Sequence, residues 1–147
     1  MLRVCILLLF YIILLKLSLE DLKEKKICDK YVWMITGLAV MAAAAIPEIG
    51  VWDRLLGVFA ISVPMTILAL IFPGSFGGGD IKLAASCGAF LGTELILKGT
   101  VCGIFIGALW SLWILFFVKQ KKNHQFPFGP CLSAGFLLAS LQLFLKI

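Results

Sequence analysis

Long apolar blocks, separated by short polar connections, constrain this chain more than any other feature of its sequence. Of its 147 residues, 62% are hydrophobic and 14% are charged, whereas a soluble globular domain carries about 25% charged residues. A helix needs about 20 apolar residues to cross the hydrocarbon of a membrane, and most of the blocks approach that length. We therefore expect one all-α integral membrane domain over residues 1–147, with six transmembrane helices. The predicted spans are residues 2–19, 31–46, 55–72, 81–97, 100–118 and 131–145.

The distribution of basic residues predicts the orientation of these spans. Positive residues in short loops accumulate on the cytoplasmic side of a membrane. Loops one, three and five are rich in lysine, so we place them in the cytoplasm and both termini on the extracytoplasmic side. The first block lacks the small-residue cleavage site of a signal peptide, so we expect it to remain as the first span. Those three loops hold Lys23, Lys25, Lys26, Lys30, Lys82, Lys119, Lys121 and Lys122, and the other side holds Arg3, Arg54, Lys98 and Lys146.

Asp80 is the strongest candidate for chemistry, because acidic residues are costly to bury near membrane helices and commonly serve a function there. It follows Gly77, Gly78 and Gly79 and directly precedes an apolar block. Glycines permit close approach of another backbone, so an extended substrate could lie against this segment. The alternative is that Asp80 only caps the N-terminus of the following helix, where aspartate is favoured. The spacing alone leaves both interpretations open.

Asp21 lies where the first span meets the cytoplasm, in a run of mixed charges. Such a run is usually a solvated surface and by itself indicates no chemistry. The predicted topology, however, places Asp21 and Asp80 at the same membrane depth, so their side chains could meet. Two carboxylates in contact share a proton. The charged one can then draw a proton from water, while the protonated one polarises a peptide carbonyl.

Three segments resemble motifs of the type IV prepilin peptidase family. Gly77-x-Gly79-Asp80 resembles the family's G-x-G-D motif, and the segment from Asp21 to Ile27 resembles its first aspartate segment. Near the C-terminus, the four residues from Pro127 to Pro130 resemble its closing motif. The three matches occur in the expected order and cover nearly the whole chain.

The resemblance implies a G-x-G-D-type intramembrane aspartic protease with Asp21 and Asp80 as its catalytic pair. Its substrate would be a prepilin-like precursor with a short basic leader, and the glycine run with Lys82 would orient that leader. Two prolines around a glycine also make a good turn before a helix, so we favour a structural role for the closing motif. The residues concerned are Gly77, Gly78, Gly79 and Lys82 at the G-x-G-D motif, and Pro127, Gly129 and Pro130 at the closing motif.

The chain departs from the family pattern at two places. Cys28 and Asp29 stand where the family usually has Pro-Asn, so a rigid turn is lost and Asp29 adds a carboxylate that could contribute to the site. Larger members carry a cytoplasmic insert with paired C-x-x-C motifs and also N-methylate the new N-terminus. Loop one contains only Cys28, so we expect a short form that cleaves without N-methyltransferase activity.

No metal or other cofactor is expected. The five cysteines have no C-x-x-C spacing, and His124 has no companion at zinc-ligand spacing. The expected partners are prepilin-like proteins and membrane lipid, with no nucleic acid, and the expected location is the cytoplasmic (inner) membrane. Two other classes stay open: a non-catalytic membrane protein that anchors a pilus or secretion machine, and a small transporter with the two aspartates as a proton relay.

Overall fold

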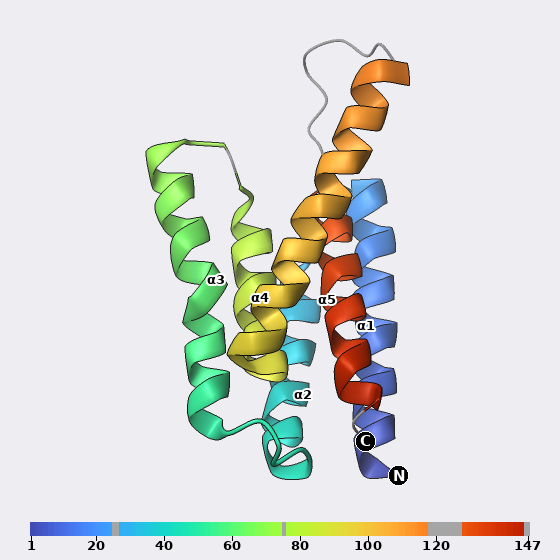
Figure 1. The fold of residues 1–147 in the computed structure, drawn as a ribbon, viewed down its shortest axis with the longest axis vertical. Coiled ribbons are helices and arrows are strands. Elements are labelled where there is room, and N and C mark those ends of the chain that lie inside the picture. Colours follow the sequence, from blue (N-terminus) through green and yellow to red (C-terminus); the bar gives the residue numbers. More distant parts are fainter. Residues whose placement is uncertain (25–26, 75, 118–127, 146–147) are drawn as a thin grey trace.

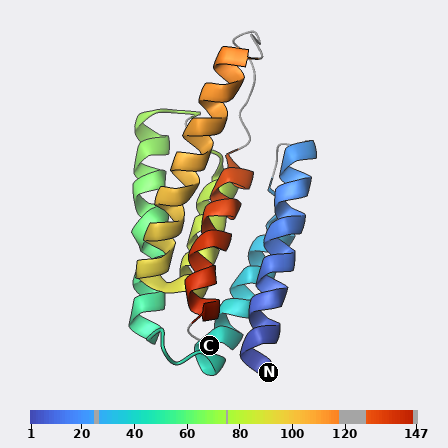
Figure 2. The ribbon, with the colours of Figure 1, turned by 45° about the vertical axis from the view of Figure 1, so that its right-hand side comes forward.

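The computed structural model describes residues 1–24, 27–74, 76–117 and 128–145. The described residues form five α-helices that run along the long axis of a bundle (Figures 1 and 2). The first helix begins and the last one ends at the same end of the bundle, the lower end in Figure 1. The helices are α1 (Leu2–Glu24), α2 (Asp29–Ala45), α3 (Val51–Ile71), α4 (Gly78–Phe117) and α5 (Gly129–Leu145).

The long helix α4 is broken at Gly92, where φ is 76° and ψ is 176°. Figure 1 shows that the chain descends along the first part of α4 and ascends after this point. Glycine adopts such a backbone readily because it has no Cβ. Asp53 of α3 bonds to the residue that follows the break. Its carboxylate accepts a hydrogen bond from the Thr93 backbone N–H at 3.4 Å, and its backbone carbonyl accepts one from the Thr93 hydroxyl at 2.9 Å.

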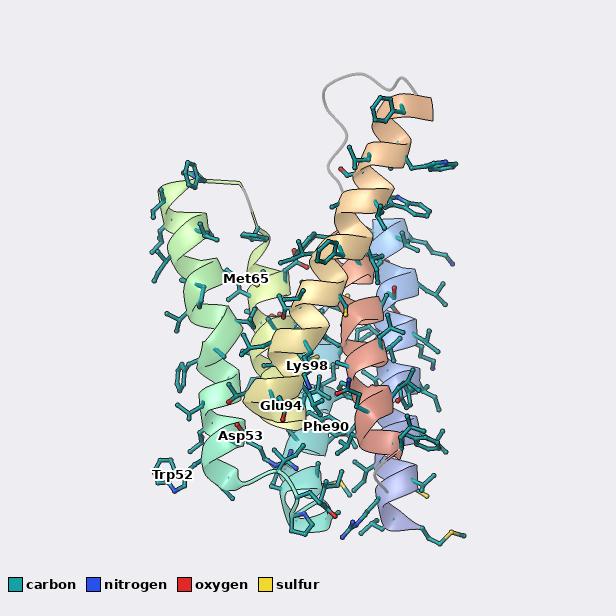
Figure 3. The ribbon with its side chains drawn as sticks, in the orientation of Figure 1. Trp52, Asp53, Met65, Phe90, Glu94 and Lys98 are labelled. Atoms are coloured by element: carbon teal, nitrogen blue, oxygen red, sulfur yellow. The ribbon has the colours of Figure 1, made fainter. Side chains whose placement is uncertain are left out.

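The sequence predicts a loop at residues 98–99, between the fourth and fifth spans, and this prediction is wrong. Both residues are helical and belong to the second part of α4. Lys98 Nζ lies 2.6 Å from Glu94 Oε1, one turn earlier in the helix (Figure 3), and 3.4 Å from Gln142 Oε1 of α5. A Cβ on Gly99 would lie 3.1 Å from the Gly135 carbonyl oxygen, so this glycine permits close contact with α5. Of the two predicted loop residues, Gly99 is therefore a packing residue, and Lys98 makes polar contacts on the helix surface.

The first part of α4 lies at the centre of the bundle. Phe10 of α1 stacks on Phe90 of α4 with ring centroids 4.1 Å apart and planes inclined by 7°. On the α3 side, a Cβ on Gly57 would lie 2.6 Å from the Gly88 carbonyl oxygen, so the two backbones are in contact. Small residues permit such close helix approach in membranes.

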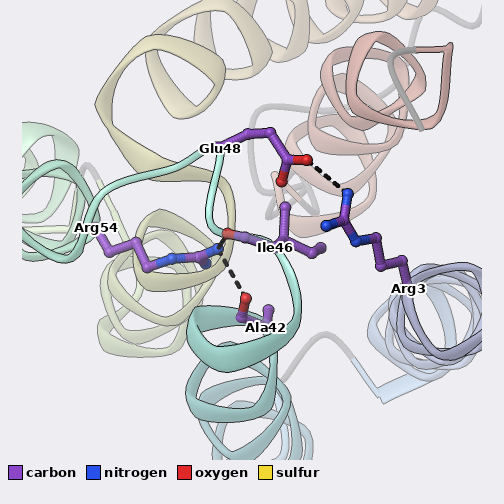
Figure 4. A network of polar contacts seen from close by, with 5 residues as sticks. All are labelled: Arg3, Ala42, Ile46, Glu48 and Arg54. Atoms are coloured by element: carbon purple, nitrogen blue, oxygen red, sulfur yellow. Dashed lines mark hydrogen bonds and ion pairs between the residues drawn. The ribbon is translucent and has the colours of Figure 1, made fainter.

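Arg54 lies in the first turn of α3, and not in the loop where the sequence predicts it; its side chain is buried. Its guanidinium donates to the carbonyl oxygens of Ala42 and Ile46 at 3.1 Å (Figure 4). It also donates to those of Ala89 and Phe90, at 3.2 and 2.7 Å. These carbonyls lie where α2 and the first part of α4 end, and terminal carbonyls lack a full set of helical partners. Arg54 therefore ties two helix ends to α3.

Apolar side chains cover the outside of the bundle. Trp52 is 79% exposed and points away from the helices (Figure 3), and Trp33 and Phe105 are similarly exposed. An apolar surface of this extent suits lipid and not water. Among the described helices, α1, α3 and residues 78–114 of α4 are long and apolar enough to cross a membrane. The prediction of an all-α, multi-pass membrane protein is confirmed at this level.

Candidate active site

Asp80 is the third residue of α4 and lies just inside the helix. The Gly77 backbone N–H donates to its carboxylate, and the Asp80 backbone N–H donates to the Gly77 carbonyl oxygen at 3.0 Å. This reciprocal arrangement resembles a capping box, in which the third helical residue bonds back to the residue before the helix. Asp80 therefore caps the start of α4, although it does so from the third helical position.

The glycine run before Asp80 is open on one side and closed on the other. Gly77 and Gly78 are exposed, and nothing lies within 4 Å of a Cβ built on Gly78. A Cβ on Gly79, by contrast, would lie 2.8 Å from the Ile27 Cβ. Gly77 and Gly78 are therefore the open part of the glycine run, and Gly79 is packed against Ile27.

Asp21 lies in the last turn of α1 and is 5% exposed. Leu17 and Leu14, one and two turns earlier, are buried on the same face of the helix. Its neighbours Leu22 and Lys23 are exposed. The interpretation of this run as a solvated surface therefore fails for Asp21 itself, although it holds for residues 22–24.

The fold brings Asp21 and Asp80 together. The two carboxylates are close enough for the charge on Asp21 to act on Asp80, and like charges in proximity disfavour simultaneous ionisation. Asp21 lies near the end of α1 and Asp80 near the start of α4, so both aspartates are at the end of the bundle opposite Arg54 and the break in α4.

The closing motif also reaches this site. Pro127 lies outside the described residues. Gly129 begins α5 and is buried, and a Cβ placed on it would clash with Asp21 Oδ2. Pro130 occupies the first turn of α5, where a proline costs no helical hydrogen bond. Phe76, two residues before α4, packs against Phe128, directly before α5, with ring centroids 5.6 Å apart.

Asp29 faces Lys82 and not the aspartate pair. The Lys82 ammonium lies 3.0 Å from each oxygen of the Asp29 carboxylate, and the two side chains are 56% and 60% exposed. This ion pair joins the start of α2 to the start of α4. No pattern in the sequence indicates that these two residues meet.

A polar cluster that no sequence pattern indicates lies beside Asp21. The Tyr31 hydroxyl donates to the Glu20 carboxylate. The Lys30 ammonium lies 3.5 Å from that carboxylate and 4.7 Å above the centre of the Tyr31 ring. These contacts tie the end of α1 to the start of α2 next to the site. Among the described residues, no group of three or more His, Cys, Asp or Glu side chains could hold a metal ion.

The fold and the site together define a multi-pass helical membrane protein with an aspartate pair at one end of its bundle. The model of the type IV leader peptidase family matches residues 8–112, a range that includes both aspartates. The chain belongs to this family, and the predicted family membership is confirmed.

A curated relative is the prepilin leader peptidase/N-methyltransferase of Bacillus subtilis (strain 168). It is 35% identical to this chain over 101 residues, which make up 68% of this chain and 41% of the relative. The chain thus matches less than half the length of that protein. No solved structure matches the chain.

Proposed function

We propose that this protein is a membrane aspartic endopeptidase that removes the short basic leader from type IV prepilin-like precursors. Asp21 and Asp80 form its catalytic pair. The observation that carries the proposal is that both aspartates lie around the buried side chain of Ile27. Ile27 packs against Gly79, which directly precedes Asp80. It also packs against Gly129, which is in contact with Asp21. Membership of the leader peptidase family and the name of the Bacillus relative support the same reaction.

The proposed mechanism uses one shared proton. The ionised carboxylate takes a proton from a water molecule, whose oxygen attacks the carbonyl carbon of the scissile peptide bond. The protonated carboxyl donates a hydrogen bond to the carbonyl oxygen and stabilises the charge that develops there. The tetrahedral intermediate then collapses and the C–N bond breaks. The leaving amine takes up the proton that the first carboxylate took from water, so the pair returns to one shared proton. Because the two groups titrate as a unit, neither carries a fixed role before substrate binds.

The proposed topology has six crossings, with the active site at the cytoplasmic face of the inner membrane. The reversal at Gly92 supports this count, because α4 then supplies two crossings. The lysine distribution supports both termini on the extracytoplasmic side. A precursor whose leader lies in the cytoplasm and whose apolar helix lies in the membrane would reach a site so placed.

Peptide cleavage without N-methylation is the activity we propose. The connection between α1 and α2 is residues 25–28 and contains only Cys28, so it lacks the paired C-x-x-C insert of larger members. The Bacillus relative is named for both activities and is longer than the matched region.

Co-expression with a tagged prepilin-like precursor tests the proposal, with leader removal followed by the change in size. We expect cleavage by the wild type and its loss in both Asp21→Asn and Asp80→Asn, because neither variant can share a proton between two carboxylates. Asp29→Asn is the matched control, since Asp29 lies near the site but faces Lys82.

Each variant is also checked for normal insertion in the membrane. Cleavage that persists in Asp21→Asn or Asp80→Asn would remove that residue from the pair. Loss of cleavage in Asp29→Asn alone would move the catalytic role to Asp29. A wild type that cleaves no precursor, yet is required for pilus or secretion assembly, would favour the anchoring role instead.

A further inference from the structure

Ile27 lies between the start of α4 and the start of α5, beside the proposed catalytic pair. Its side chain is 8% exposed and belongs to the apolar core, although the residue is in the short connection between α1 and α2. On one side it packs against Gly79, where an added Cβ would lie 2.8 Å from the Ile27 Cβ. On the other side it packs against Gly129, where an added Cβ would lie 3.3 Å from the Ile27 Cδ1.

The two glycines are the immediate neighbours of the catalytic carboxylates. Gly79 directly precedes Asp80 in the first turn of α4. Gly129 is in contact with Asp21, because a Cβ built on it would lie 3.1 Å from the Asp21 Cγ and still closer to Oδ2. Ile27 therefore touches one element that carries Asp80 and another against which Asp21 rests.

We propose that Ile27 is a positioning residue that sets the separation of Asp21 and Asp80. Gly79 and Gly129 have no side chains, so the Ile27 side chain can pack directly against their backbones. This inference rests on the proposed function, because it concerns the geometry of the pair proposed there. A β-branched side chain suits such a spacer, since its χ1 is restricted and it holds its shape under pressure from both sides. Any side chain at either glycine would displace Ile27 or Asp21.

The separation matters because proton sharing depends on the distance between the two charges. Their repulsion falls as the distance grows, so a loosened pair ionises at both sites and loses its proton donor. Misplacement of a catalytic group by about 1 Å can cost about 10²-fold in rate. Substrate binding at the exposed Gly77 and Gly78 does not depend on Ile27 to the same extent.

The kinetic test compares Gly129→Ala and Ile27→Ala with the conservative variant Ile27→Val, and uses Gly37→Ala as a control. Gly37 is exposed on α2, and nothing lies within 4 Å of an added Cβ there. We expect kcat to fall by about 10²-fold in Gly129→Ala and by a smaller factor in Ile27→Ala, with KM little changed. Ile27→Val keeps the branched Cβ and should retain most of the activity.

A second measurement reports the spacing without using activity. Asp21→Cys and Asp80→Cys are combined in a background whose five native cysteines are replaced by alanine, and a short bifunctional methanethiosulfonate links them in membranes. We expect efficient linking with Ile27 in place, and a lower yield when Gly79→Ala or Ile27→Ala is added. Gly78→Ala is the matched control, because it adds a methyl group to the same glycine run in open space.

The two measurements separate the two proposals. A wild type that cleaves no precursor, but in which linking depends on Ile27 and Gly79, would overturn the proposed function and keep the spacer. Unchanged linking in Gly79→Ala and Ile27→Ala would overturn the spacer, whatever the protease activity. A kcat in Gly129→Ala equal to that of Gly37→Ala would also overturn the spacer role of Ile27. If one of Gly129→Ala, Gly79→Ala and Ile27→Ala fails to accumulate in the membrane, the other two variants decide the result.

Discussion

At the scale of single residues, the ion pair between Lys82 and Asp29 separates a surface role from a catalytic one. Both groups are more than half exposed, and exposed ion pairs typically contribute about 0.2–1 kcal/mol. We expect the swapped variant Asp29→Lys with Lys82→Asp to unfold within about 1 kcal/mol of the wild type, because the pair can re-form in reverse. Unfolding by denaturant in detergent, with leader removal measured in parallel, checks this.

The single variants provide the control for that pair. Lys82→Asp alone places two carboxylates side by side near the site, and Asp29→Lys alone places two ammonium groups there. Both should be less stable than the swapped variant. A swapped variant that is as stable as the wild type but binds precursor poorly would give Lys82 a direct role in holding the leader. Equal stability of all four proteins would show that the ion pair contributes nothing.

At the scale of helices, the break in α4 depends on one glycine. Gly92 has a positive φ, and a Cβ there would lie 2.6 Å from Asp53 Oδ2 and 2.7 Å from the Ile49 Cγ2. Backbone strain of this kind costs about 1–3 kcal/mol before any clash is counted. We therefore expect Gly92→Ala to lower the free energy of unfolding by at least that amount, measured by denaturant in detergent against Gly37→Ala.

The folded fraction of Gly92→Ala should still cleave precursor. Gly92 is twelve residues after Asp80, so about 18 Å of helix separates the break from the site. A stable Gly92→Ala protein would mean that α4 passes residue 92 without a positive φ. A destabilised Gly92→Ala protein whose folded fraction lacks activity would mean that the break sets the position of Asp80.

The sequence predicts the helices better than it predicts the contacts that form the site. Apolar length located every helix, and the burial of Asp21 agrees with the helical spacing of Leu14 and Leu17. The break at Gly92 was missed because its cap, Asp53, comes from another helix, while Lys98 and Gly99 offered a more obvious local turn signal. The contacts of Ile27 and Gly129 are tertiary in the same way, since each depends on a helix start far along the chain.

At the scale of the whole molecule, the proposed orientation makes a prediction about which residues face which side of the membrane. Lys23 is exposed at the end of α1, and Gly50 is exposed just before α3, so the two lie on opposite sides if α2 crosses. In a cysteine-free background, we expect Gly50→Cys to react with a membrane-impermeant maleimide added to spheroplasts. Lys23→Cys should react only after the membrane is permeabilised.

A third position decides between one and two crossings in α4. Glu94 is exposed just after the break, so a reversal at Gly92 would bring it to the same side as Gly50. As part of one continuous 40-residue helix, which would be about 60 Å long, it would instead lie near the middle of the hydrocarbon and would not react. Labelling of Glu94→Cys together with Gly50→Cys would therefore support six crossings. Labelling of Lys23→Cys alone in intact spheroplasts would invert the orientation and place the aspartate pair on the outer face, where a cytoplasmic leader could not reach it.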